Sequence, residues 1–244
     1  MHDDQDMSTD HGYFIGDTHP HKKLQHGHSE KVFDKDCKAW MIEWIKWLLE
    51  IPYDDTPIVF RQGNPFDKSY DGLQPMEGDD KGVLFIAVPA YGSSSNTYNN
   101  DFVIVPPGEW HLFLSPYVIF NSVQEYPSLD NDRLFSMAKR QVDSVYKLEV
   151  LLDGLSLECC RVPITANDNA FATIPHERNI LGIRRSEMED GNNRIQIVAD
   201  GYGCFLNPID PGLHILTIKG YSPTYSIDTQ IQLNFRGPKS NTKR

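Results

Sequence analysis

The pattern of apolar and polar residues along this chain is mostly that of β-strands. Apolar and polar side chains alternate from Tyr225 to Phe235, which predicts a strand with one face on a core. The unbroken apolar run from Val83 to Val88 predicts a strand buried on both faces. Asp153-Gly154 separates two apolar segments, which favours a two-residue hairpin turn. Further strands are expected at residues 101–105, 109–120, 148–152, 155–162, 194–199, 202–206 and 213–219.

Two segments have the apolar spacing of helices instead. The first helix is expected near residues 36–51, with Asp34 or Asp36 as its N-cap and Pro52 after its end. Its apolar face is rich in tryptophan, with Trp40, Trp44 and Trp47 within two turns. A second helix is expected near residues 130–146, with an apolar stripe on one face.

Many strands and only two helices predict a mainly β fold, a β-sandwich with Greek-key-like connections. A jelly-roll or cupin-like barrel is the alternative. Residues 1–30 contain few apolar side chains and are expected to be a disordered, His-rich arm. Residues 31–236 then form a single domain, and residues 237–244 form a flexible tail.

Six short motifs occur together in a fixed order along the chain. They are Trp40-Met41-Ile42-Glu43-Trp44, Gly82-Val83-Leu84-Phe85-Ile86-Ala87, Val105-Pro106-Pro107-Gly108-Glu109, Val150-Leu151-Leu152-Asp153-Gly154, Asp200-Gly201-Tyr202 and Pro211-Gly212-Leu213-His214-Ile215. In this order they resemble a group of uncharacterised bacterial proteins. The resemblance spans roughly Asp36 to Phe235 and implies a β-sandwich, often secreted, with no established activity.

Charge and targeting signals narrow the classes of partner. The 244 residues carry a formal net charge of -11, which repels phosphate backbones, so nucleic acid is not expected as a partner. The longest apolar run is too short to span a bilayer, and a soluble protein is expected. The acidic first ten residues do not resemble a signal peptide. The protein is therefore cytoplasmic, or secreted if a leader has been lost.

Cysteine usage also bears on the compartment of the protein. The four cysteines follow no zinc-ligand spacing and are interpreted as free thiols, which suits a reducing compartment. They are Cys37, Cys159, Cys160 and Cys204.

Tyrosines at expected strand ends and loops are the candidate ligand-binding residues. An aromatic ring on a loop can stack on a sugar or anchor a protein partner. The candidates are Tyr91, Tyr98, Tyr117, Tyr126 and Tyr221.

Histidines and carboxylates are the candidates for metal chemistry. His111 and His214 each follow a Pro-Gly turn into a strand, as a metal-binding His does in cupins, with Glu109 or Glu125 as the nearest carboxylates. An open catalytic site needs about three fixed protein ligands, so a divalent metal is a minor alternative to having no cofactor. Two further sets of residues are weaker candidates. The N-terminal arm contains six imidazoles that could bind a metal ion: His2, His11, His19, His21, His26 and His28. Three carboxylates lie close together in the sequence: Glu125, Asp130 and Asp132.

Three hypotheses of function remain open at this point. The leading one is an uncharacterised β-sandwich module that binds a glycan, another ligand or a protein partner through its loops. The second is a metal-dependent, cupin-like enzyme. The third is an interaction protein that docks through the Trp-rich helix. The sequence leaves the ligand and the oligomeric state undetermined.

Overall fold

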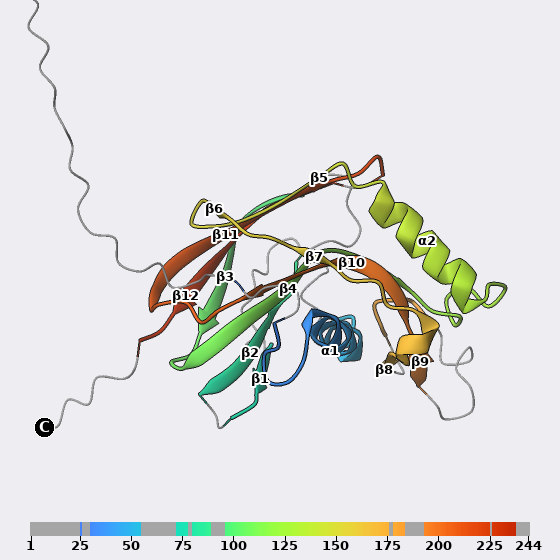
Figure 1. The fold of residues 1–244 in the computed structure, drawn as a ribbon, viewed down its shortest axis with the longest axis horizontal. Coiled ribbons are helices and arrows are strands. Elements are labelled where there is room, and N and C mark those ends of the chain that lie inside the picture. Colours follow the sequence, from blue (N-terminus) through green and yellow to red (C-terminus); the bar gives the residue numbers. More distant parts are fainter. Residues whose placement is uncertain are drawn as a thin grey trace, which may run out of the picture.

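The computed structural model describes residues 25, 30–54, 72–77, 80–88, 96–175, 178–183, 193–224 and 226–237. Figure 1 shows a mainly β fold with two helices. The elements are α1 (Cys37–Glu50), β1 (Leu73–Pro75), β2 (Lys81–Ile86), β3 (Asn96–Val105), β4 (Glu109–Asn121), α2 (Asn131–Asp143), β5 (Lys147–Leu152), β6 (Leu155–Ser156), β7 (Cys160–Arg161), the 3-10 turn η1 (Ala166–Asp168), β8 (Phe171–Thr173), β9 (Arg194–Gln196), β10 (Val198–Leu206), β11 (Gly212–Tyr221) and β12 (Ser226–Phe235).

Two five-stranded sheets face each other. The first sheet has the order β1-β2-β4-β10-β7 and the second the order β3-β12-β11-β5-β6, while β8 and β9 form a small separate ladder. Both large sheets are mixed, because β2 is parallel to β4 and β3 is parallel to β12. Consecutive strands β2, β3, β4 and β5 alternate between the sheets. The sheets are not closed on each other among the described residues, so the sandwich prediction is confirmed and the barrel alternative is wrong.

The inter-sheet core is mainly aliphatic. Side chains of both sheets fill it, including Leu84 and Leu114 from the first sheet and Leu216 and Leu233 from the second. Val83, on the other face of β2, is also fully buried. The prediction that this strand is covered on both faces is therefore confirmed. The Asp153-Gly154 turn is confirmed as well: both residues have positive φ, and Leu152 pairs with Leu155.

Helix α1 covers the outer face of the first sheet, on the side away from the second sheet (Figure 1). Asp36 caps it by accepting a hydrogen bond from the Ala39 backbone N–H at 2.8 Å. Trp40 and Trp44 are each 2% exposed. The Trp40 ring contacts the rings of Phe85 and Phe205, and the Trp44 Nε1–H donates to the Ile86 carbonyl of β2. This face of the helix is buried in the chain's own core, so the hypothesis of a Trp-rich docking helix is wrong.

Helix α2 flanks β4 and β10 at one end of the sandwich (Figure 1). Asp130 caps it by accepting from the Arg133 N–H at 2.9 Å. The helix ends at Asp143, three residues before the expected end. The Ser144 N–H bonds back to the helix, whereas the Tyr146 N–H donates to the Tyr221 carbonyl of β11 at 3.0 Å. Pairing with the sheet therefore ends the helix.

The prediction that all four cysteines are free thiols is wrong. A disulfide joins Cys37 of α1 to Cys160 of β7, and only Cys159 and Cys204 are free. A glycine opposite Cys160 makes room for the disulfide, because a Cβ at Gly203 would lie 3.0 Å from the Cys37 Sγ. Structural disulfides are typical of oxidising compartments, so the argument for a reducing one no longer holds.

None of the described helices is both long and apolar enough to cross a membrane. The six histidines of the N-terminal arm lie outside the described residues, and its disorder stays a prediction. Gln25 of that segment is described, and it forms an isolated bridge with Leu206 of β10.

Candidate binding site

The tyrosines that the sequence singled out have different environments. Tyr91 and the side chain of Tyr98 lie outside the described residues. Tyr117 is only 5% exposed and bonds to Ser222, and its burial raises the pKa of the phenol. Its expected exposure is wrong because it lies in the middle of β4 rather than on a loop. Tyr126 is 40% exposed, and Tyr221 is half-buried at the end of β11.

Tyr221 belongs to an aromatic pair at the edge of the second sheet where β11 ends and β5 begins. Its ring stacks on that of Tyr146, with the ring centroids 6.3 Å apart and the planes 22° apart. Tyr146 is 72% exposed, the highest exposure among the large hydrophobic side chains of the described residues. The sequence pattern placed Tyr146 at the end of a helix and did not single it out. The available signal was a tyrosine two residues before a predicted strand.

Charged groups lie around this aromatic pair. The Lys147 Nζ is 5.9 Å from the centroid of the Tyr221 ring, and the Tyr221 hydroxyl donates to Asp228 Oδ2 at 3.5 Å. Lys147 also lies 3.7 Å from a carboxylate oxygen of Glu149. We call Tyr146, Tyr221, Lys147 and Asp228 the tyrosine platform. It combines an exposed ring with an ammonium group and a carboxylate that can bind polar groups of a ligand.

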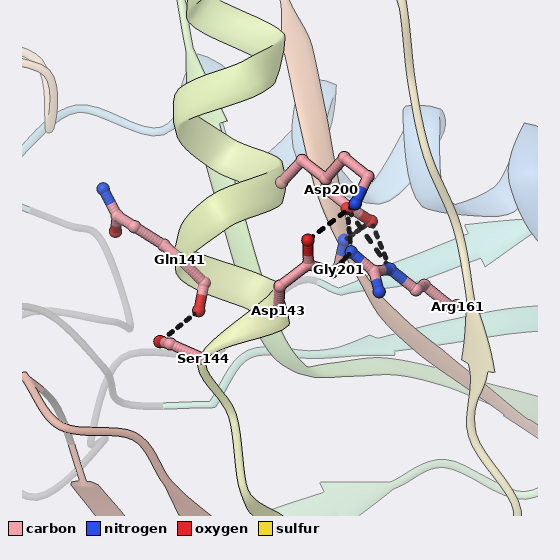
Figure 2. Close-up of polar contacts among 7 residues, drawn as sticks. Gln141, Asp143, Ser144, Arg161, Asp200 and Gly201 are labelled. Atoms are coloured by element: carbon pink, nitrogen blue, oxygen red, sulfur yellow. Dashed lines mark hydrogen bonds and ion pairs between the residues drawn. The ribbon is translucent and has the colours of Figure 1, made fainter.

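An ion pair between the buried carboxylate of Asp200 and the more exposed guanidinium of Arg161 is drawn in Figure 2. Asp200 of β10 is 1% exposed. The Arg161 guanidinium of β7 binds it through Nε at 3.2 Å and through Nη2 at 2.5 Å. The Gly201 N–H donates to the same carboxylate at 2.9 Å. A carboxylate this deeply buried needs such partners, because an unpaired charge there would be costly.

Arg161 reaches the end of α2 as well. Its Nη2 lies 2.6 Å from Asp143 Oδ1 (Figure 2). Hydrogen bonds from Lys139 and then from Arg161 lower the pKa of Asp143. We call Arg161, Asp200 and Asp143 the arginine clamp. It joins β7, β10 and α2, and it contacts the helix at Asp143, three residues before Tyr146. The spacing of charged residues in the sequence did not predict this clamp, although an Asp within the apolar strand β10 was a usable signal.

The two histidines proposed as metal ligands do not converge. His111 contacts the rings of Phe33 and Phe205, and it pairs in β4 with Val83 of the helix-side core. His214 pairs with Leu233 of the inter-sheet core. The first sheet therefore lies between the two imidazoles. Among the described residues, no three His, Cys, Asp or Glu side chains form a group that could hold a metal ion.

His214 has a structural role in the β5–β6 hairpin. Its Nδ1 lies 2.6 Å from Asp153 Oδ2, and its Nε2 lies 2.9 Å from the Asp210 carbonyl oxygen. Asp153 also accepts from the Ile215 N–H at 2.8 Å. The imidazole therefore holds the hairpin turn against β11.

The suggested carboxylate group separates into individual roles. Asp130 is the N-cap of α2, and Asp132 lies in its first turn, where it complements the helix dipole. Glu125 accepts hydrogen bonds from the N–H and the hydroxyl of Ser122 at 3.1 and 3.3 Å. Burial raises the pKa of Glu125 to about 7, while the Ser122 hydrogen bonds oppose that rise. Glu125 thus titrates near neutral pH at the opposite end of α2 from the platform.

Comparisons with known proteins do not assign the chain to a family. No family model matches the sequence, and no curated protein matches it. Among solved structures, the solution structure of amebosin matches with a TM-score of 0.18 and 11% sequence identity, covering 58% of this chain and 96% of that chain. A TM-score this low carries no argument about fold or function.

Proposed function

We propose that this β-sandwich is a binding module that holds a saccharide on the tyrosine platform. The observation that carries the proposal is the exposed ring of Tyr146 stacked on Tyr221, at the end of a clamped helix. The apolar face of a sugar ring packs against a planar aromatic side chain. The hydroxyls of the sugar then hydrogen-bond to Lys147 and Asp228, which flank the rings.

The size of the platform favours a small ligand over a protein partner. A stable protein interface buries about 800 Å² on each side, and its energy is concentrated in buried apolar anchors. The platform offers two tyrosine rings, of which one is half-buried. Two of the exposed aliphatic side chains, Leu213 and Ile215, lie toward the other end of β11. A sugar ring matches the platform in area and in its mixture of apolar and polar groups.

Preorganisation also supports binding at this place. The Tyr146 backbone is fixed from one side by its hydrogen bond to Tyr221 and from the other by the arginine clamp on Asp143. A ring that is already held in position loses little conformational entropy when a ligand arrives. Arg161 is thus a positioning residue for the platform and does not itself contact the ligand.

The test is retention of the protein on a panel of immobilised polysaccharides and oligosaccharides. We expect the wild-type protein to bind at least one saccharide, Tyr146→Ala to bind about ten-fold more weakly, and Tyr146→Phe to retain most of the binding. Tyr126→Ala is the matched control, because Tyr126 is an exposed tyrosine away from the platform. Absence of any saccharide binding, or equal loss in the Tyr126 and Tyr146 variants, would contradict the proposal.

A further inference from the structure

The neighbouring residues Cys159 and Cys160 serve opposite faces of the first sheet. Successive side chains of an extended strand point to opposite sides. Cys160 lies on the helix side, where it forms the disulfide with Cys37. Cys159 packs instead against the inter-sheet core, to which Cys204 of β10 also belongs. The two free thiols are therefore on the same side of the sheet.

The strand register brings these two thiols opposite each other. Arg161 pairs with Tyr202 and Cys160 pairs with Gly203, so the next pair in the same antiparallel register is Cys159 with Cys204. Directly opposed residues have Cβ atoms about 4.5–5.5 Å apart, and small adjustments bring such a pair to disulfide geometry. A hydrogen bond between the two thiols, together with burial, raises the pKa of Cys204.

The two thiols differ in access. Cys204 is completely buried, whereas Cys159 is partly exposed. The side chain of Gln25 lies beside them: its Nε2 donates to the Glu158 carbonyl, just before β7, at 2.9 Å and to Cys204 Sγ of β10 at 3.4 Å. A reagent from solvent therefore meets Cys159 first, and Cys204 is reached only from its neighbour.

We propose that Cys159 and Cys204 form a redox-active dithiol that closes to a second disulfide on reaction with a small-molecule disulfide. This assignment is independent of saccharide binding. The Cys159 thiolate attacks one sulfur of the reagent, forms a mixed disulfide and releases one small thiolate. The Cys204 thiolate then attacks Cys159 Sγ and expels the second. The two cysteine protons pass to the released thiolates, so the dithiol is oxidised by two electrons and the reagent becomes two thiols.

Closure would fasten β7 on both of its faces. Cys160 already ties this two-residue edge strand to α1, and the new bond would tie the adjacent residue to β10. Arg161, the last residue of β7, is part of the arginine clamp. The oxidised form should therefore unfold at a higher temperature than the form with one disulfide.

The experiment treats the full-length protein with oxidised glutathione, then denatures it, alkylates free thiols and measures its intact mass. Before treatment we expect two alkylated thiols. After treatment we expect none, with no glutathione attached and no dimer formed. Unchanged alkylation of both thiols, a stable glutathione adduct beside one free thiol, or a disulfide-linked dimer would overturn the proposal.

Two single variants assign the order of the steps. Cys204→Ala lacks the second nucleophile, so a glutathione adduct should accumulate on Cys159. Cys159→Ala should form neither an adduct nor a new disulfide, because Cys204 is buried. An adduct on Cys204 in that variant would overturn the assignment of Cys159 as the first nucleophile. In the Cys204→Ala protein, a disulfide from Cys159 to Cys37 or Cys160, with the displaced cysteine released as a free thiol, would show that Cys159 exchanges with the existing disulfide and would overturn the proposal.

Discussion

The two aromatic regions of the molecule use similar side chains for different purposes. Around α1, tryptophan and phenylalanine rings meet at tilted and edge-on angles, and Trp40 and Trp44 are nearly inaccessible to solvent. At the platform, two tyrosines stack with one ring mostly in water. Removing a ring from the first region leaves a cavity, whereas removing one from the second leaves only solvent. Burial, and not residue type, distinguishes the two regions, and it is the exposed pair that we propose for saccharide binding.

The largest effect is expected from Trp44→Ala, which removes a ring from the α1 region. It should lower the free energy of unfolding by about 3–5 kcal/mol, because it creates a cavity. It also removes the hydrogen bond from the Trp44 Nε1–H to the Ile86 carbonyl at 3.0 Å. Urea unfolding followed by circular dichroism measures this. Trp44→Phe, which keeps an aromatic ring, should lose less than half as much, and equal stability of all three proteins would contradict the packing of α1.

Breaking the arginine clamp should affect both stability and binding. Arg161→Met leaves the Asp200 carboxylate buried without its cation, which should cost about 3 kcal/mol. It also frees the end of α2 before Tyr146, so saccharide binding should weaken even under conditions where the variant is fully folded.

Trp44→Ala serves as the control for that comparison, because it destabilises the fold away from the platform. If both variants, measured while folded, bind like the wild type, then the clamp has no positioning role.

Glu125 should make stability depend on pH without changing the platform. Its pKa is about 7 in the folded protein against 4.5 when unfolded, so the unfolded state loses its proton first as the pH rises. Stability should therefore fall by about 2–3 kcal/mol between pH 4.5 and 7 and then level off. Glu125→Gln should remove this slope in urea titrations at several pH values. If stability instead fell as the pH was lowered from 7 to 4.5, and Glu125→Gln abolished that fall, then the pKa of Glu125 would be lowered by folding and not raised.

The smallest effect on stability is expected from Tyr146→Ala. A side chain that is 72% exposed leaves almost no cavity, so the free energy of unfolding should change by at most about 0.5 kcal/mol. Thermal and urea unfolding should overlay with the wild type, while saccharide binding weakens about ten-fold. A loss of stability comparable with that of Trp44→Ala would mean that the platform is part of the core.

Local features of the chain could be predicted from the sequence because neighbouring residues determine them. Asp36 and Asp130 cap the two helices through their own backbones, and the Asp153-Gly154 turn follows from residues that tolerate positive φ. The apolar run of β2 indicated burial on both faces without reference to its neighbours. These features, with the alternation of β12, were enough to predict a sandwich with two helices.

The sites depend on contacts between residues far apart in the sequence. The disulfide joins cysteines 123 positions apart, the Arg161–Asp200 pair spans 39 positions, and His111 and His214 are separated by a sheet that no local pattern reveals. The sequence predicted Tyr146 to be the last residue of a helix, whereas its N–H bonds to the Tyr221 carbonyl of β11 in the structure. The sequence by itself determined both helices and most of the longer strands, since periodicity and capping are local. Strands β1 and β8 and the first residues of β3 lie outside the segments expected to be strands. Only the tertiary structure decided which side chains meet, because strand order and register are selected by the burial of the whole core.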